Sequence, residues 1–150
     1  MADPIAWYQA NAEMISARYE SVPMEAVHGW LVDLLLPPPA LILDVGAGSG
    51  RDAAWLAGKG YDVVALEPSP AMRKAAEGRH PDSRIRWLGD RLPGLEQTLK
   101  TGLSFDFIVL SAVWMHLASA DRPRAFRKLI TLLKLAQTWQ HPATEPPFKR

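Results

Sequence analysis

Three glycines on alternate positions follow a short apolar run and an acidic residue. The run is Leu41–Val45, it contains Asp44, and the glycines are Gly46, Gly48 and Gly50. Glycine tolerates positive φ values and lets a ligand approach the backbone closely. A helix that begins directly after the loop would point its unpaired N–H groups into it. The pattern predicts a turn that binds a ligand with an anionic group.

The residue that ends the next apolar run indicates the kind of ligand. Tyr61–Leu66 is typical of a second strand, and Glu67 follows it. An acidic residue about 20 residues after a glycine turn commonly binds ribose hydroxyls. The two features together predict a cofactor that contains a nucleoside.

The glycine spacing separates two cofactor classes. Dinucleotide sites use G-x-G-x-x-G, whereas this loop reads G-x-G-x-G with Asp44 just before it. A carboxylate would repel a pyrophosphate, but it suits an amino acid moiety that carries both an ammonium and a carboxylate group. The spacing therefore favours S-adenosylmethionine, and a nicotinamide-dependent oxidoreductase stays open as an alternative.

Alternating strands and helices must position these residues. Apolar runs predict parallel strands at 41–45, 61–66, 84–88 and 105–110, with helices between them. Two helices, Trp7–Tyr19 and Met24–Leu36, are expected before the first strand. A helix after Asp121 is expected to bury a stripe of Ala125, Phe126, Leu129, Ile130 and Leu133.

Four segments in this order resemble the class I S-adenosylmethionine-dependent methyltransferases, especially their small bacterial members. The segments are Leu41–Leu56, Val63–Met72, Trp87–Leu92 and Phe105–Leu117. The resemblance covers residues 5–134. It implies an α/β, Rossmann-like parallel sheet of about four strands in the order 3-2-1-4, with helices on both faces. It also implies one cofactor-binding domain over residues 1–135, in which residues 1–40 form the leading helices, and methyl transfer to an undetermined acceptor.

The resemblance implies roles for single residues. Glu67 is expected to bind the two ribose hydroxyls, and Asp44 the methionine ammonium or the loop amides. Asp90 is expected to bind the adenine amino group, with a turn or helix-cap role as its alternative. The expected cofactor-binding residues are Asp44, Gly46, Ala47, Gly48, Ser49, Gly50, Glu67, Pro68, Met72, Asp90, Arg91 and Ser111.

The loop after the fourth strand is expected to face the methyl acceptor. His116 is the candidate catalytic base, because an imidazole can accept a proton near neutral pH, and a structural, hydrogen-bonded or cap-forming histidine is its alternative role. Tyr8, Tyr19 and Trp114 are further candidates for contact with the acceptor, and packing between elements is their alternative role. The remaining histidines show no metal-ligand spacing, so no metal is expected.

The chain departs from the family after Leu135. Residues 136–150 contain three prolines and neither valine nor isoleucine, so an irregular tail is expected in place of the later strands. The fourth strand would then be an open edge through which the chain could pair with another molecule. A truncation near Leu135 is the favoured explanation, and strands borrowed from another chain are the alternative.

Composition narrows the remaining choices. The 150 residues include no cysteine, carry a net charge of +1 and are 48% hydrophobic, which suits one domain in the cytoplasm. No signal peptide or membrane-spanning run is evident. The carboxyl-terminal part is basic, but its Arg122, Arg124, Arg127 and Lys128 are expected to form the solvated face of a helix rather than to bind nucleic acid. Besides the methyltransferase, an inactive S-adenosylmethionine-binding or regulatory module and a poorly folding fragment stay open.

Overall fold

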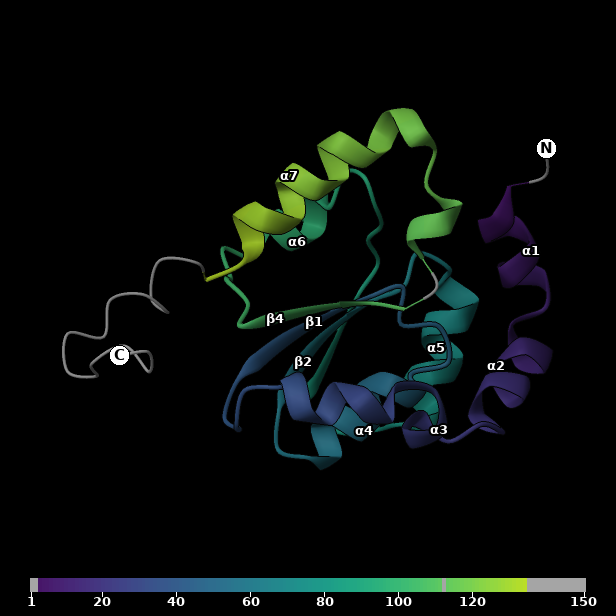
Figure 1. The fold of residues 1–150 in the computed structure, drawn as a ribbon. Coiled ribbons are helices and arrows are strands. Elements are labelled where there is room, and N and C mark those ends of the chain that lie inside the picture. The colour runs from purple at the N-terminus through teal and green to yellow at the C-terminus, as the bar shows by residue number, and fades with distance from the viewer. Residues whose placement is uncertain (1–2, 112, 135–150) are drawn as a thin grey trace.

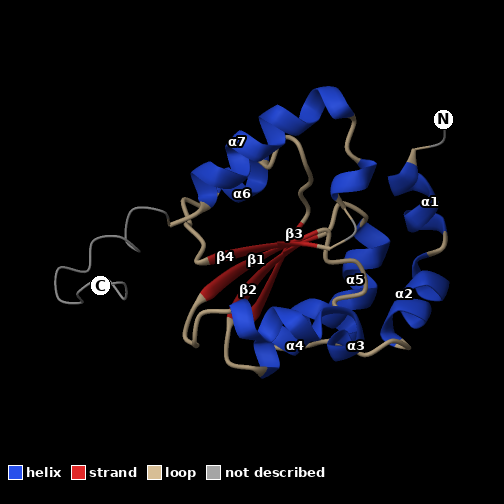
Figure 2. Cartoon of the chain, viewed as in Figure 1, coloured by secondary structure: helices blue, strands red, loops and turns tan. Residues whose placement is uncertain are grey.

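The computed structural model describes residues 3–111 and 113–134. Apolar runs in this part of the chain form one parallel sheet of four strands: β1 (Leu41–Val45), β2 (Asp62–Leu66), β3 (Ile85–Leu88) and β4 (Phe107–Leu110). The strand order is β3-β2-β1-β4 (Figure 2). The α/β fold and the order 3-2-1-4 are thus confirmed. The expected irregular tail, residues 136–150, lies outside the described residues.

Helices flank both faces of the sheet, as Figure 1 shows. Helix α4 lies with α3 on one face, α6 and α7 lie on the other, and α1 and α2 pack on α5. The bounds are α1 Pro4–Ala10, α2 Ala12–Glu20, α3 Met24–His28, α4 Arg51–Gly58, α5 Pro70–Arg79, α6 Glu96–Lys100 and α7 Arg122–Leu132. None of the helices in the described ranges has the length and apolar character needed to cross a lipid bilayer.

The central strands are buried on both faces, which explains their almost unbroken apolar sequences. Ile42 and Val63 pack in the core beneath α4, whereas the residues that follow them, Leu43 and Val64, pack in the core beneath α7. Side chains alternate between the faces of a strand, so Asp44 lies on the same face as Ile42. This alternation places the Asp44 carboxyl group near the end of β1, on the side of the sheet that α4 covers.

The leading segment differs from the two continuous helices expected for it. The first breaks at Asn11, whose side-chain amide donates to the Trp7 carbonyl oxygen (2.9 Å) and competes with the helical pattern. The second changes after α3 into a 3₁₀-helix, η1 (Gly29–Leu34). Because a 3₁₀-helix has 3.0 residues per turn, the expected apolar face is split, and Trp30 and Leu34 are exposed.

Helix α7 buries a narrower stripe than expected. Ala125, Leu129 and Leu132 are buried, whereas Phe126 is 56% exposed and Ile130 is 38% exposed. The buried residues follow the spacing i, i+4 and i+7, which is a single face of the helix. The two exposed side chains lie beside that face. The prediction that they join the core is therefore wrong for the described part of the chain.

The outer side of β4 is only partly open. Ahead of the strand, Phe105 forms an isolated parallel bridge with Leu133. The Phe105 amide donates to the Leu132 carbonyl oxygen (2.7 Å), and the Lys134 amide donates to the Phe105 carbonyl oxygen (3.0 Å). The segment after α7 therefore begins to pair beside β4, although no further strand follows within the described residues. Pairing with another molecule at this edge stays a prediction.

Ser69 offers a test of how helix α5 is held. Its hydroxyl accepts from the Met72 amide (3.3 Å) and donates to Gln9 Oε1 (2.7 Å), so it caps α5 and ties it to α1. We expect Ser69→Ala to lower the free energy of unfolding by about 1 kcal/mol, measured by urea denaturation. The exposed Ser83 supplies the control Ser83→Ala. Equal stabilities of the two variants would contradict the capping role.

Candidate cofactor site

The glycine loop after β1 lies against the end of β2. Gly46, Gly48 and Gly50 have φ values of 74°, 58° and 86°, in the left-handed region that favours glycine. The Ala47 amide donates to the Leu66 carbonyl oxygen (2.8 Å), which fixes the loop to the neighbouring strand. Helix α4 begins at Arg51, directly after the loop. The loop therefore turns sharply at the carboxyl edge of the sheet and leads into a helix N-terminus.

Side chains from distant segments lie close to the same glycines. A Cβ atom on Gly46 would collide with Val113, which follows β4. A Cβ atom on Gly50 would lie 2.9 Å from the Trp87 ring, and one on Gly48 would lie 3.7 Å from the Tyr19 ring. The loop therefore lies between the leading helices and the segment after β4. The contact of Val113 with the loop was not predicted, since a single apolar side chain carries no signal of it.

Glu67 joins the end of β2 to the glycine loop. Its side-chain oxygen Oε2 accepts from the Gly48 amide (3.0 Å), and Oε1 accepts from the Ser69 amide (3.1 Å). The residue is only 7% exposed. Burial raises the pKa of the Glu67 carboxyl, while these two hydrogen bonds and Arg73 oppose the rise. The structure thus brings Glu67 and the loop together, as the two motifs require.

Three carboxyl groups gather behind the loop. Asp44 is 1% exposed and Asp52 on α4 is 7% exposed, and the charges of Asp52 and Glu67 both act on Asp44. Burial, and then the charges of Asp52 and Glu67, raise the pKa of Asp44 to about 8, against the opposing effect of Arg51. Among the described residues, no hydrogen-bond partner reaches the buried Asp44 Oδ2. The presence of Asp52 in this cluster was not predicted, because an aspartate at the start of a helix usually interacts with the helix dipole.

The leading helices are fastened to the site by polar contacts. Gln9 Oε1 accepts from the Ser69 hydroxyl (2.7 Å) and the Ala71 amide (3.0 Å) at the start of α5. Partial burial and a hydrogen bond with Tyr8 raise the pKa of Tyr19 to about 12. These contacts hold the leading helices, which carry Tyr8 and Tyr19, against the start of α5. Gln9 was missed in the sequence, since a lone glutamine on a helix carries no signal of this role.

Asp90, Met72 and Pro68 are further expected cofactor contacts, and each has its own surroundings in the structure. Asp90 Oδ2 accepts from the Thr98 amide (2.8 Å) and hydroxyl (2.6 Å), and Oδ1 accepts from the Arg91 amide (2.9 Å). The carboxylate is thus already used in a turn and a helix start. Met72 is buried beneath α2, and Pro68 is half-buried. A contact of Asp90 or Met72 with adenine stays a prediction.

The segment after β4 is bent and carries a short 3₁₀-helix, η2 (Trp114–His116). Trp114 is half-buried and packs against the core beneath α7, whereas His116 is exposed. Ser111 is half-buried at the end of the strand. The imidazole is therefore open to solvent, whereas the indole ring lies against the core. Their contact with an acceptor stays a prediction.

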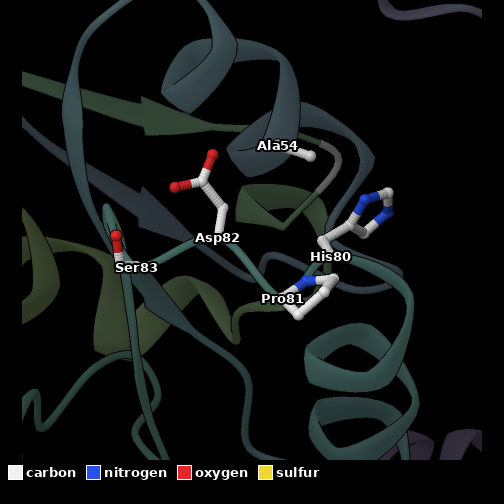
Figure 3. Close-up of a pocket in the computed structure, with 5 residues that line it drawn as sticks. All are labelled: Ala54, His80, Pro81, Asp82 and Ser83. Carbon is white, nitrogen blue, oxygen red and sulfur yellow. The ribbon is translucent and has the colours of Figure 1, made fainter.

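An open pocket of about 440 Å³ lies beside the start of α4. Figure 3 shows it between Ala54 on α4 and the segment that leads to β3, with His80, Pro81, Asp82 and Ser83 as the other lining residues. His80 Nε2 lies 2.7 Å from Glu20 Oε1, so the imidazole is already paired. The glycine loop and Glu67 do not line this pocket. One lining residue nevertheless borders the loop, because a Cβ atom on Gly50 would lie 3.0 Å from the His80 ring.

The comparisons with known proteins agree with this geometry. The model of the methyltransferase domain family matches residues 42–135. The chain belongs to this methyltransferase family. The match begins inside β1 and includes the glycine loop, Glu67, β4 and helix α7. It thus covers every element of the sheet that positions the site.

Two curated relatives are longer than the chain. The "Probable S-adenosyl-L-methionine-dependent methyltransferase TehB" of Haemophilus influenzae is 27% identical over 136 residues, which cover 83% of the chain and 42% of the relative. The biotin biosynthesis bifunctional protein BioHC of Cellvibrio japonicus is 32% identical over 148 residues, with shares of 83% and 28%. The chain therefore spans less than half the length of either relative.

Solved methyltransferase structures share the fold. A TehB-like S-adenosylmethionine-dependent methyltransferase from Corynebacterium glutamicum has a TM-score of 0.61 and 26% identity, and the match covers 83% of this chain and 67% of that one. The structure of DhpI in complex with S-adenosylhomocysteine has a TM-score of 0.65 and 18% identity, with shares of 86% and 61%. At this identity, the second likeness supports the fold alone.

Proposed function

We propose that the chain binds S-adenosylmethionine and forms the cofactor-binding part of a methyltransferase for an undetermined acceptor. The observation that carries the proposal is the bond of Glu67 to the Gly48 amide, beside the unpartnered Asp44 Oδ2. The names of the TehB relatives and the S-adenosylhomocysteine complex of DhpI support the same cofactor. The residues present fit this cofactor at three points, the ribose, the ammonium and the loop.

The Glu67 carboxylate is oriented to accept from two neighbouring hydroxyls. A carboxylate has about four acceptor positions, two on each oxygen. The Gly48 and Ser69 amides use one position on each oxygen, which leaves one on each for a hydroxyl. The 2′ and 3′ hydroxyls of a ribose are spaced for such a pair. The two backbone amides therefore hold the carboxylate in place for an adenosyl ligand.

The acidic cluster favours a cationic amino acid over a pyrophosphate. An ammonium group would supply the missing partner of Asp44 Oδ2, and the amides of the loop and of α4 can meet the carboxylate of the same methionine. A pyrophosphate would bring further negative charge beside Asp44, Asp52 and Glu67. This electrostatic difference argues against the nicotinamide cofactor that the glycine loop alone leaves open.

Methyl transfer requires little acid–base chemistry from the protein. The bound cofactor would supply a methyl group on a sulfonium, which an acceptor atom attacks in line. Holding the two reactants in a reactive geometry accounts for about 7–11 kcal/mol of the barrier in favourable cases. The loop and Glu67 would fix the cofactor, and Tyr8, Tyr19 and Trp114 would border the acceptor. His116 remains the candidate base for an acceptor that must lose a proton.

Calorimetric titration of the protein tests the cofactor. We expect saturable binding of S-adenosylmethionine and of S-adenosylhomocysteine, and none of NAD at the same concentrations. The physical reason is the acidic cluster, which stabilises an ammonium and repels a pyrophosphate. Binding of NAD in place of the adenosyl ligands would instead support the oxidoreductase alternative.

A separate experiment tests transfer itself. S-adenosylmethionine labelled on its methyl group is incubated with the protein and with fractionated small molecules or macromolecules from a cell extract. Label that moves to one fraction, and requires the protein, would support the enzyme. Cofactor binding without transfer to any fraction would favour the inactive binding module.

A further inference from the structure

The carboxyl groups of Asp44, Asp52 and Glu67 form a cluster that the proposed function uses only in part. They come from β1, from α4 and from the residue after β2, and each is at most 7% exposed. Arg51 is the cation whose charge reaches Asp44. Its Nε donates to Asp52 Oδ1 (2.9 Å), so Asp52 is the acid that it directly neutralises. Arg73 opposes the pKa rise of Glu67, so among the described residues these three acids face two arginines.

Asp44 is the least stabilised of the three carboxyl groups. Its neighbours across the sheet are Ala65 on β2 and Val109 on β4, which are both apolar. The charged groups that face it are Asp52 and Arg51 from α4, and Glu67 from the end of β2. The Nη1 atom of Arg51 is used in other hydrogen bonds. It donates to the carbonyl oxygens of Tyr19 in α2 (3.3 Å) and of Val22 after α2 (3.1 Å). A negative charge on Asp44 would thus be buried with an unpartnered oxygen and two acidic neighbours.

We propose that Asp44 holds a proton while the site is empty and releases it when the ammonium of the cofactor binds beside it. The inference rests on the proposed function, since it needs an amino acid moiety at this place. The O–H bond of the Asp44 carboxyl breaks, its electron pair stays on the carboxylate, and the proton passes to the buffer. The ammonium keeps its own protons and becomes the counter-ion. One positive charge thus replaces another inside the cluster.

The exchange makes cofactor binding depend on pH. While Asp44 is protonated in the empty protein, each bound cofactor expels close to one proton. Affinity then rises by up to about tenfold per pH unit, by linkage between the two equilibria. The range from pH 6 to 7.5 is the useful one, because a free α-amino group is itself protonated below about 7.7. S-adenosylhomocysteine is the suitable probe, since it carries the ammonium without the sulfonium.

Calorimetry in several buffers counts the released protons. S-adenosylhomocysteine is titrated at pH 7 in buffers that differ in their enthalpy of ionisation, and the slope of the observed enthalpy gives the number released. We expect close to one proton for the natural protein and close to none for Asp44→Asn. We also expect close to none for the natural protein with 5′-methylthioadenosine, which has no amino acid moiety. The second probe keeps the test valid if Asp44→Asn fails to fold.

Each outcome decides the inference. Tight binding of S-adenosylhomocysteine without proton release would overturn it and leave the proposed function intact. Unchanged release in Asp44→Asn would assign the proton to another group, such as Glu67, and would also overturn it. Release of as many protons with 5′-methylthioadenosine would mean that the ammonium does not cause the release, and would overturn the inference. Absence of binding by every adenosyl ligand would overturn the proposed function itself, and the inference with it.

Discussion

Glu67→Gln is expected to weaken the binding of S-adenosylmethionine about ten- to a hundredfold. The carboxylate would accept charge-assisted hydrogen bonds from two ribose hydroxyls, and a hydrogen bond to a charged group is worth about 1.5–3 kcal/mol. Glutamine keeps the size of the side chain, but one of its two terminal atoms becomes a donor. That atom can no longer accept from the Gly48 or Ser69 amide, which now orient the carboxylate. Calorimetric titration measures the change in the dissociation constant.

Glu77 supplies a matched control for this experiment. It lies exposed on α5, the helix that follows Glu67 along the chain. Glu77→Gln makes the same chemical change and alters the net charge equally, so we expect the affinity to stay within twofold of the natural protein. An unchanged affinity in Glu67→Gln would reject the ribose role. An equal loss in both variants would indicate a general effect of charge.

The sheet and the glycine loop could be predicted because local sequence determines them. Leu41–Val45 is apolar, lies between proline and glycine residues, and forms β1 with the expected bounds. The loop requires positive φ values at Gly46, Gly48 and Gly50, which only glycine adopts without strain. Parallel strands buried on both faces also leave few ways to order the sheet. The strands and the loop therefore followed from residue type and spacing, whereas the order 3-2-1-4 came from the resemblance to the class I methyltransferases.

The helices were predicted less well, because their limits depend on competing contacts. A hydrogen bond from the Asn11 side chain ends α1, and a 3₁₀ turn replaces the second half of the expected Met24–Leu36 helix. On α7, periodicity alone could not decide how wide a stripe the core would cover. Phe126 and Ile130 fit the helical pattern, yet the sheet beneath contacts only the narrower face.

The two sequence motifs of the site were predicted, but the residues that surround them were not. Glu67 and the glycine loop were paired from their spacing, and the structure joins them by a hydrogen bond. Val113 and Gln9 come from distant parts of the chain, so no local pattern could place them beside the site. The cluster of Asp44 and Asp52 arises because the start of α4 returns over the end of β1. Such a cluster is a property of the tertiary fold.

Asp44→Asn is expected to remove most of the pH dependence of stability of the ligand-free protein between pH 5 and 8. Burial beside two other acids raises the pKa of Asp44 to about 8 in the folded protein, whereas an unfolded aspartate has a pKa of about 3.9. The folded state therefore binds the proton more tightly. This contribution to stability is fully present below the unfolded pKa, and it is lost as the pH rises through the folded pKa.

The expected slope is large enough to measure by urea denaturation. The free energy of unfolding of the natural protein falls by up to about 1.4 kcal/mol per pH unit in this window, from Asp44 alone. Asparagine is neutral throughout, so Asp44→Asn should exceed the stability of the natural protein by an amount that grows with pH from pH 5 to pH 8. The exposed Asp62 at the start of β2 supplies the control Asp62→Asn, which should keep the natural slope. Parallel pH profiles for all three proteins would mean that Asp44 is already charged in the empty site, and an ammonium would then find a carboxylate with no proton to release.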